Sequence, residues 1–139
     1  MTARLQIKRI YEPAAPDDGA RILVDRIWPR GVTKSAAALT MWFKDIAPTP
    51  DLRKWFNHDP ERWSEFGRRY RKELEANAVS VAHMRAFLKE GRVTLLYAAH
   101  DPVHNQALVL ADYIKKHAMP RKSARAAASR SPATRSVKR

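Results

Sequence analysis

The 139-residue chain contains no cysteine and only four glycines. Without cysteine, neither a disulfide framework nor a thiolate metal site can form, and this composition suits a reducing cytoplasm. So few glycines exclude a glycine-rich phosphate loop, and the G-x-G-x-x-G, Walker, G-x-S-x-G and H-E-x-x-H signatures are absent. No apolar run approaches the roughly 18 residues of a membrane-spanning helix, and the N-terminus lacks the apolar region of a signal peptide. We therefore expect a soluble, cytoplasmic protein with no membrane partner, and no motif names a cofactor.

Charge is unevenly distributed along the chain, whose formal net charge is +13. Residues 119–139 carry seven lysines and arginines, no acid and few larger apolar side chains. Such a segment buries too little apolar surface to offset the entropy of ordering it, so we predict a disordered basic tail after one domain of residues 1–118. A basic tail attracts polyanions through counterion release, which makes nucleic acid a predicted partner. The alternative is a solvated appendage that binds nothing specifically.

Hydrophobic patterning predicts strands that alternate with helices. Apolar runs or alternation predict strands at residues 5–10, 21–28 and 92–99, with a fourth short strand near residues 43–46 as an alternative. Short β-branched runs such as the one at residues 22–24 are typical of buried strands in parallel sheets. The pattern predicts an α/β fold, a single small domain with a mostly parallel sheet of three to four strands flanked by helices in Rossmann-like layers.

Helix starts are indicated by residues that cap helices well. Thr33 is expected to cap a short helix through residues 34–43, residues 51–56 to form a helical turn, and Ser80 to cap a helix that stops at Gly91.

The tripeptide His-Asp-Pro occurs twice, at residues 58–60 and 100–102. Aspartate is a favoured N-cap and proline fits the first helical position, so Asp59 and Asp101 are each expected to start a helix. The apolar faces of these helices are expected to contain Trp63, Phe66, Tyr70 and Leu74 in the first, and Val103, Ala107, Leu110, Ala111 and Ile114 in the second.

Polar residues follow two of the predicted strands, at the carboxyl ends where open α/β sheets place ligands. In "VDRIWPRG", residues 24–31, the charged side chains Asp25, Arg26 and Arg30 surround Trp28. The arginines are suited to a bidentate grip on phosphate or carboxylate, and the tryptophan to stacking on a ring. The alternative is structural: Asp25 would form an ion pair with an arginine that fixes the loop, and Trp28 would belong to the core.

The second cluster, in "YAAHDPVHN", contains Tyr97, His100, Asp101, His104 and Asn105. The N-terminus of a helix starting there would favour binding of an anion. It would also favour the neutral form of a nearby imidazole, the form that acts as a general base or hydrogen-bond donor. The plain alternative is that Asp101 only caps the helix. Proline lies between the two histidines and prevents a regular i, i+4 pair, so no metal site is predicted.

A third segment places Trp55 and His58 before the first His-Asp-Pro helix. These side chains are either core and surface residues or a lid over the pocket. If the pocket is catalytic, His104 or His58 is the candidate for proton transfer, with Asp25 orienting it. The candidate ligand-binding residues are Arg26, Trp28, Arg30, Trp55, Tyr97, His100, Asp101 and Asn105.

Three motifs taken in order, "VDRIWPRG", "LRKWFNHDPERWSEFGRRYRKEL" and "VTLLYAAHDPVHNQALVL", resemble the YeaO-like branch of the family catalogued as domain of unknown function 488. The resemblance covers about residues 4–117 and excludes the basic tail. It implies a small α/β protein of bacterial type in the cytoplasm, but no reaction or substrate.

Three functions remain open from the sequence. The first is a pocket for a small anionic ligand, nucleotide-like or phosphorylated, with or without catalysis. The second is a nucleic-acid-binding or regulatory module that uses the tail and a basic helix face made of Arg62, Arg68, Arg69, Arg71 and Lys72. The third is a structural or interaction protein with a vestigial pocket.

Overall fold

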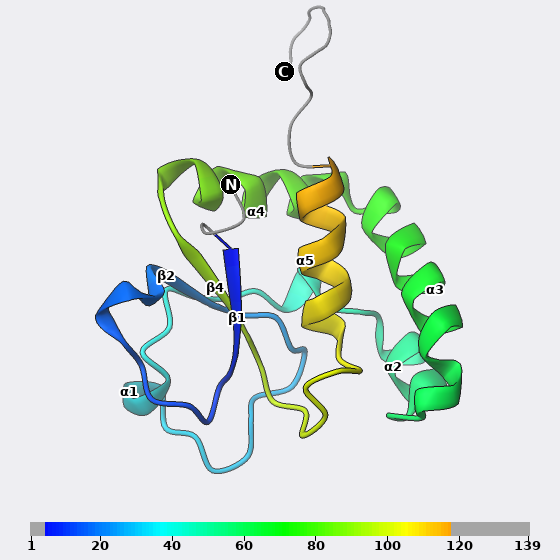
Figure 1. Ribbon diagram of the computed structural model, residues 1–139, viewed down its shortest axis with the longest axis horizontal. Helices are drawn as coiled ribbons and strands as arrows, with labels where there is room; N and C mark the ends of the chain where they lie inside the picture. Colours follow the sequence, from blue (N-terminus) through cyan, green and yellow to red (C-terminus); the bar gives the residue numbers. More distant parts are fainter. Residues whose placement is uncertain (1–4, 118–139) are drawn as a thin grey trace, which may run out of the picture.

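A computed structural model of the chain describes residues 5–117, and the predicted basic tail lies outside them. Four parallel strands form one sheet in the order β1-β4-β2-β3 (Figure 1). The strands are β1 (Leu5–Arg9), β2 (Ala20–Leu23), β3 (Met41–Trp42) and β4 (Val93–Tyr97). The helices are α1 (Lys34–Ala37), α2 (Pro50–Phe56), α3 (Trp63–Ala76), α4 (Ala78–Glu90) and α5 (Gln106–His117). The predicted α/β class and parallel sheet are confirmed.

The central strand β4 shows why the sheet is parallel and buried. All five of its residues are buried, as expected for a strand covered on both faces. On one face Leu95 belongs to the main hydrophobic core with Leu110 of α5 and Tyr70 of α3. On the other face Leu96 packs in a smaller cluster with Ala37 of α1. Figure 1 accordingly shows α1 apart from the group formed by α3, α4 and α5.

A buried ion cluster supports the smaller face near the start of β2. The carboxylate of Asp18 accepts hydrogen bonds from Arg21 at 2.5 Å and from Lys8 at 3.1 Å. Burial opposes ionisation of Asp18, but these bonds and one from the Ala15 N–H outweigh it and lower its pKa to about 2. Because these partners pair with the buried Asp18 carboxylate, the domain avoids an unpaired buried charge, which would be strongly destabilising.

Several predicted helix starts are confirmed. The Thr33 hydroxyl accepts a hydrogen bond from the Ala36 N–H at the start of α1. Asp59 caps a 3-10 helix, Pro60–Arg62, that leads directly into α3. The helix that ends at Gly91 is also present, as α4.

Other local predictions were wrong, because tertiary contacts decided between competing signals. The helix after Thr33 ends at Ala37, and the fourth strand lies at Met41–Trp42 rather than near residues 43–46, which include a 3-10 helix, Lys44–Ile46. This strand is fixed by pairing with β2, where Phe43 N–H donates to the Leu23 carbonyl at 2.8 Å. Ser80 does not cap α4; it lies inside the helix and is buried.

The second His-Asp-Pro segment does not start a helix. Asp101 Oδ1 accepts hydrogen bonds from the N–H groups of Val103 and His104, which closes a turn. Helix α5 begins at Gln106, after Asn105, whose Oδ1 accepts from the Leu108 N–H at 3.2 Å. Val103, expected in the core, is therefore exposed, whereas the other predicted core residues of this helix are buried.

Candidate functional site

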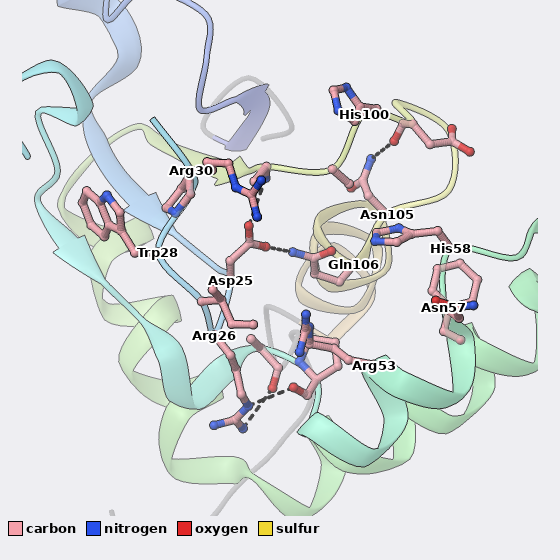
Figure 2. Close-up of a pocket in the computed structure, with 18 of the residues that line it drawn as sticks. Asp25, Arg26, Trp28, Arg30, Arg53, Asn57, His58, His100, Asn105 and Gln106 are labelled. Atoms are coloured by element: carbon pink, nitrogen blue, oxygen red, sulfur yellow. Dashed lines mark hydrogen bonds between the residues drawn. The ribbon is translucent and has the colours of Figure 1, made fainter. Parts of the chain in front are cut away.

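A cavity of about 1320 Å³ opens at the carboxyl ends of β2 and β4. The two strands are neighbours in the sheet, so the loops that follow them face the same space. The other walls come from α2 and the segment before it, from Phe66 of α3 and from the start of α5 (Figure 2). The titratable and cationic side chains in the lining are Asp25, Arg26, Arg30, Arg53, Lys54, His58, His100, Asp101 and His104.

Asp25 follows β2 and is half-buried in this cavity. Its Oδ2 accepts a hydrogen bond from the Ala98 N–H at 3.0 Å, and its Oδ1 accepts one from the Gln106 side chain. Burial raises the pKa of Asp25 from 3.8 to about 6, although these hydrogen bonds and the charge of Arg53 act in the opposite direction. The carboxyl group therefore titrates close to neutral pH.

Gln106 and Arg53 were missed by sequence reasoning. The Gln106 amide bridges β2 to α5 by donating to the Val24 carbonyl at 3.3 Å and to Asp25. Neither residue belongs to the two strand-end segments that the sequence singled out. Gln106 stands next to Asn105 in the third family motif, but its role cannot be recognised until the start of α5 is known.

Arg26 lines the cavity, but part of its guanidinium is bound by the chain. Its guanidinium donates to the carbonyls of Pro48 at 2.9 Å and Ala47 at 3.3 Å. Figure 2 shows this group on the far side from the Asp25 carboxylate. Arg26 therefore fixes the segment between β3 and α2, while still contributing to the lining.

Trp28 is also bound by contacts within the protein. Its indole N–H donates to the Val32 carbonyl at 2.7 Å, and its ring meets Trp42 edge-to-face with centroids 5.2 Å apart. The tryptophan lines the cavity but is half-buried in the smaller core.

Three cations line the cavity with neither a salt bridge nor a side-chain hydrogen bond to any residue in 5–117. These are Arg30 on the loop after β2, and Arg53 and Lys54 on α2. All three are exposed, so their charged groups are available to a ligand. Arg30 was predicted for this role, whereas the helix positions follow from the packing of α2 beside the strand ends.

His104 forms a dyad with Asp101. Their Nδ1 and Oδ2 atoms are 2.8 Å apart, and the ring of Trp63 contacts the imidazole edge-to-face. Hydrogen bonds from Val103 N–H and from His104 lower the pKa of Asp101, which is therefore ionised and accepts. The bond to an ionised Asp101 requires a proton on Nδ1 of His104, so Nε2 is the ring nitrogen left for another partner.

The other two predicted histidines also reach the cavity. His58 follows Asn57 in the turn after α2, and both residues have positive φ values, 55° and 47°. His100 lies after β4, with its Nδ1 3.4 Å from the guanidinium of Arg9. Asn105 is buried and donates to the Asp101 carbonyl at 3.0 Å, which positions the loop.

Two predicted ligand-binding residues are not among those that line the cavity. Trp55 packs under the guanidinium groups of Arg69, 4.2 Å from its ring centroid, and Arg62, at 5.2 Å. Tyr97 is buried at the end of β4 in the main core. Neither side chain is brought to Asp25 and the cations.

The described residues 5–117 contain no group of three or more histidines and acids that could hold a metal ion. Within the same part of the chain, no helix is long and apolar enough to cross a membrane.

Comparisons with known proteins identify the family. Residues 4–134 match the family described as "Inactive DUF488-N3 subclade". The chain is 41% identical over 111 residues to "Uncharacterized protein YeaO" of Escherichia coli K12, covering 80% of this chain and 96% of the relative. It is equally identical over 111 residues to "Uncharacterized protein Rv3073c" of Mycobacterium tuberculosis H37Rv, covering 93% of that relative. No solved structure matches. The chain belongs to the DUF488 family, as a YeaO-like member that matches its inactive N3 subclade.

Proposed function

We propose that this protein binds a small anionic ligand, phosphorylated or nucleotide-like, in the cavity at the carboxyl ends of β2 and β4. The observation that carries the proposal is the gathering of Arg30, Arg53 and Lys54 around one cavity without salt-bridge partners among residues 5–117. Cations that form no salt bridge inside the protein are suited to an external anion, and arginine matches phosphate and carboxylate geometry bidentately.

The rest of the cavity fits a ligand with an organic body. Apolar groups from Ile27, Pro29 and Phe56 line it beside the cations. Small-molecule sites commonly combine such apolar walls with a few placed polar groups. A bare inorganic ion would leave most of this surface unused.

Binding without turnover is favoured over catalysis. The matching family description calls the subclade inactive, which supports a binding role for a cavity that still contains Asp25 and three histidines. The Asp101–His104 dyad resembles the base-and-orienter pair of acid–base sites, so it is the place where any residual proton transfer would occur.

The alternative nucleic-acid function has less support from the helix face that was predicted to carry it. On α3, Arg68 and Arg69 both pair with Glu65, and Arg71 pairs with Asp112. These arginines are therefore partly neutralised. A role for the basic tail stays a prediction, as does the cytoplasmic location.

A thermal-shift titration of the full chain tests the proposal, with inorganic phosphate, ribose 5-phosphate and adenosine 5′-phosphate as probes. A ligand that binds only the folded state raises the melting temperature in a concentration-dependent way. We expect such a rise in the wild type and its loss in Arg30→Ala and Arg53→Gln. Lys89→Gln is the matched control, because Lys89 is exposed near the end of α4, just before the start of β4 and away from the cavity. All variants keep the same tail, so binding by the tail cancels.

A response that is equal in all four proteins, or absent from all of them, would contradict the proposal. It would favour a structural or interaction role with a vestigial pocket.

A further inference from the structure

We propose that the cavity selects anions that also carry a hydrogen-bond donor, a hydroxyl or an N–H, which binds the acceptor pair formed by Asp25 and Gln106. This inference rests on the proposed anion-binding function and specifies its ligand class. It assigns two different ends to the cavity: a cationic end for the anion and an acceptor end for the donor.

The Gln106 amide can offer only an acceptor to a ligand. One of its N–H bonds points to the Val24 carbonyl and the other to Asp25. The opposite amide orientation would set its carbonyl oxygen against the Val24 carbonyl oxygen, and two acceptors repel. Both amide hydrogens are thus engaged, and Oε1 is the atom left for a further partner.

Asp25 adds acceptors of the same kind. An ionised carboxylate has about four lone-pair directions. The Ala98 N–H and the Gln106 amide occupy two of them, so capacity for a further donor remains in a side chain that lines the cavity. Figure 2 shows Asp25 and Gln106 joined at the centre of the site.

The acceptor end penalises simple anions. A phosphate placed near ionised Asp25 is repelled, and the repulsion is larger in a partly desolvated cavity than in water. A ligand that brings a donor to Asp25 exchanges this repulsion for a charge-assisted hydrogen bond. Arg30, Arg53 and Lys54 can then hold its anionic group.

The direction of the pH dependence separates the two ligand classes. Asp25, whose pKa is raised to about 6, repels a simple anion less when it is protonated and binds a donor better when it is ionised. The other charged or titratable groups of the cavity are Arg26, Arg30, Arg53 and Lys54, the histidines 58, 100 and 104, and Asp101. Ligand phosphates also titrate near pH 6. Groups that act on the phosphate affect two phosphomonoesters in a similar way, so their contributions are reduced in the ratio of the two affinities. The pH dependence of this ratio therefore reports mainly on Asp25.

The experiment measures affinities of the full chain by calorimetry for three phosphomonoesters. Phenyl phosphate has an organic body without donors, ribose 5-phosphate has hydroxyl donors, and 2′,3′-dideoxyadenosine 5′-phosphate has an amino donor without ribose hydroxyls. We expect at least one donor ligand to bind about tenfold or more tightly than phenyl phosphate at pH 7.5, in line with a hydrogen bond to a charged group. The ligand whose preference over phenyl phosphate is lost in Asp25→Asn identifies the donor as O–H or N–H.

Two further results are expected. The ratio of donor-ligand to phenyl phosphate affinity should rise between pH 5 and pH 7.5 in the wild type, a measurement that needs no variant. Asp25→Asn should remove most of this preference while phenyl phosphate binds as tightly as before or more tightly. Its melting temperature without ligand reports whether the variant is folded.

Equal affinity for all three ligands with a flat ratio across this pH range would overturn the inference. In that case, loss of phosphate binding in Arg53→Gln would still uphold the proposed function. If no phosphomonoester binds and Arg53→Gln changes nothing, the proposed function itself fails.

Discussion

The carboxylate of Asp25 accepts the backbone N–H of Ala98 at 3.0 Å, which joins the end of β2 to the end of β4. The same carboxylate accepts from Gln106 at the start of α5. One half-buried acid therefore connects three elements and also faces the cavity. A change at this position is expected to affect both the stability of the fold and the chemistry of the site.

Asp25 should make the protein less stable as pH rises. Burial raises its folded pKa from 3.8 to about 6, so between these pH values the folded state binds more protons than the unfolded state. The free energy of unfolding then falls as pH increases through this window, by on the order of 3 kcal/mol in total, and levels off above it. Urea unfolding of the wild type and Asp25→Asn at pH 4 to 7.5 measures this contribution.

The comparison uses the difference between the two proteins, because other groups titrate in both. The wild type should lose stability relative to the variant as pH rises. A constant difference across the range would show that folding does not perturb the Asp25 carboxyl.

Arg26→Ala and Arg53→Gln should separate a structural arginine from a ligand-binding one. Removing the Arg26 side chain leaves the carbonyls of Pro48 and Ala47 without their donor, which costs roughly 1–3 kcal/mol. Arg53 is exposed and forms no salt bridge with a residue in 5–117, so its substitution should change the free energy of unfolding by only about 0.5 kcal/mol, mainly through the loss of its charge near Asp25.

Urea unfolding without ligand and the phosphate-induced thermal shift together check this pair. We expect Arg26→Ala to lower stability, whereas Arg53→Gln lowers the thermal shift. If Arg26→Ala instead lowers the thermal shift and Arg53→Gln lowers stability, Arg26 is the ligand-binding arginine, as its position after a strand suggested.

The main strands and the location of the cavity could be predicted largely because their signals are local. Apolar runs fix β2 and β4, and adjacent parallel strands bring the polar residues after them to one edge. The start of α5 could not be assigned from sequence, because Asp101 and Asn105 are both good capping residues four positions apart. The outcome depends on Asn105 being buried against the rest of the fold.

The bridging partners of Asp25 were beyond sequence reasoning for a related reason. Gln106 is distant from Asp25 in the chain, and its hydrogen bond exists only because α5 begins beside β2. For Arg26, a charged residue after a strand suggests ligand binding, but packing engages two of its five N–H donors with backbone carbonyls. Residue type indicates which chemistry is available, and packing decides where it is used.

Asn105→Ala should destabilise the protein more than Asp101→Ala. Asn105 is buried, its Oδ1 accepts from the Leu108 N–H, and its amide donates to the Asp101 carbonyl. Losing this cap costs about 1–2 kcal/mol, and the buried groups left unpaired add to it. The turn hydrogen bonds of Asp101 are more exposed, so their loss should cost less.

Chemical denaturation of the two variants at neutral pH gives the comparison. Asn105→Asp is a useful control because it retains the acceptor for Leu108 and should recover part of the loss. A larger effect of Asp101→Ala would indicate that the loop, rather than the start of α5, controls stability here.

Gly19→Ala and Gly31→Ala should differ strongly although both glycines have positive φ, 68° and 79°. A Cβ at Gly19 would collide with the backbone carbonyl of Arg92, which accepts the Ala20 N–H at the start of β2. No atom lies within 4 Å of a Cβ built at Gly31. Gly31→Ala should therefore cost only the conformational strain of about 1–2 kcal/mol, whereas Gly19→Ala adds a steric clash for a total of more than about 3 kcal/mol. Urea unfolding measures the loss of free energy of unfolding in both variants. Equal losses would mean that the Arg92 carbonyl moves away from the new Cβ without disturbing the pairing of β2 with β4.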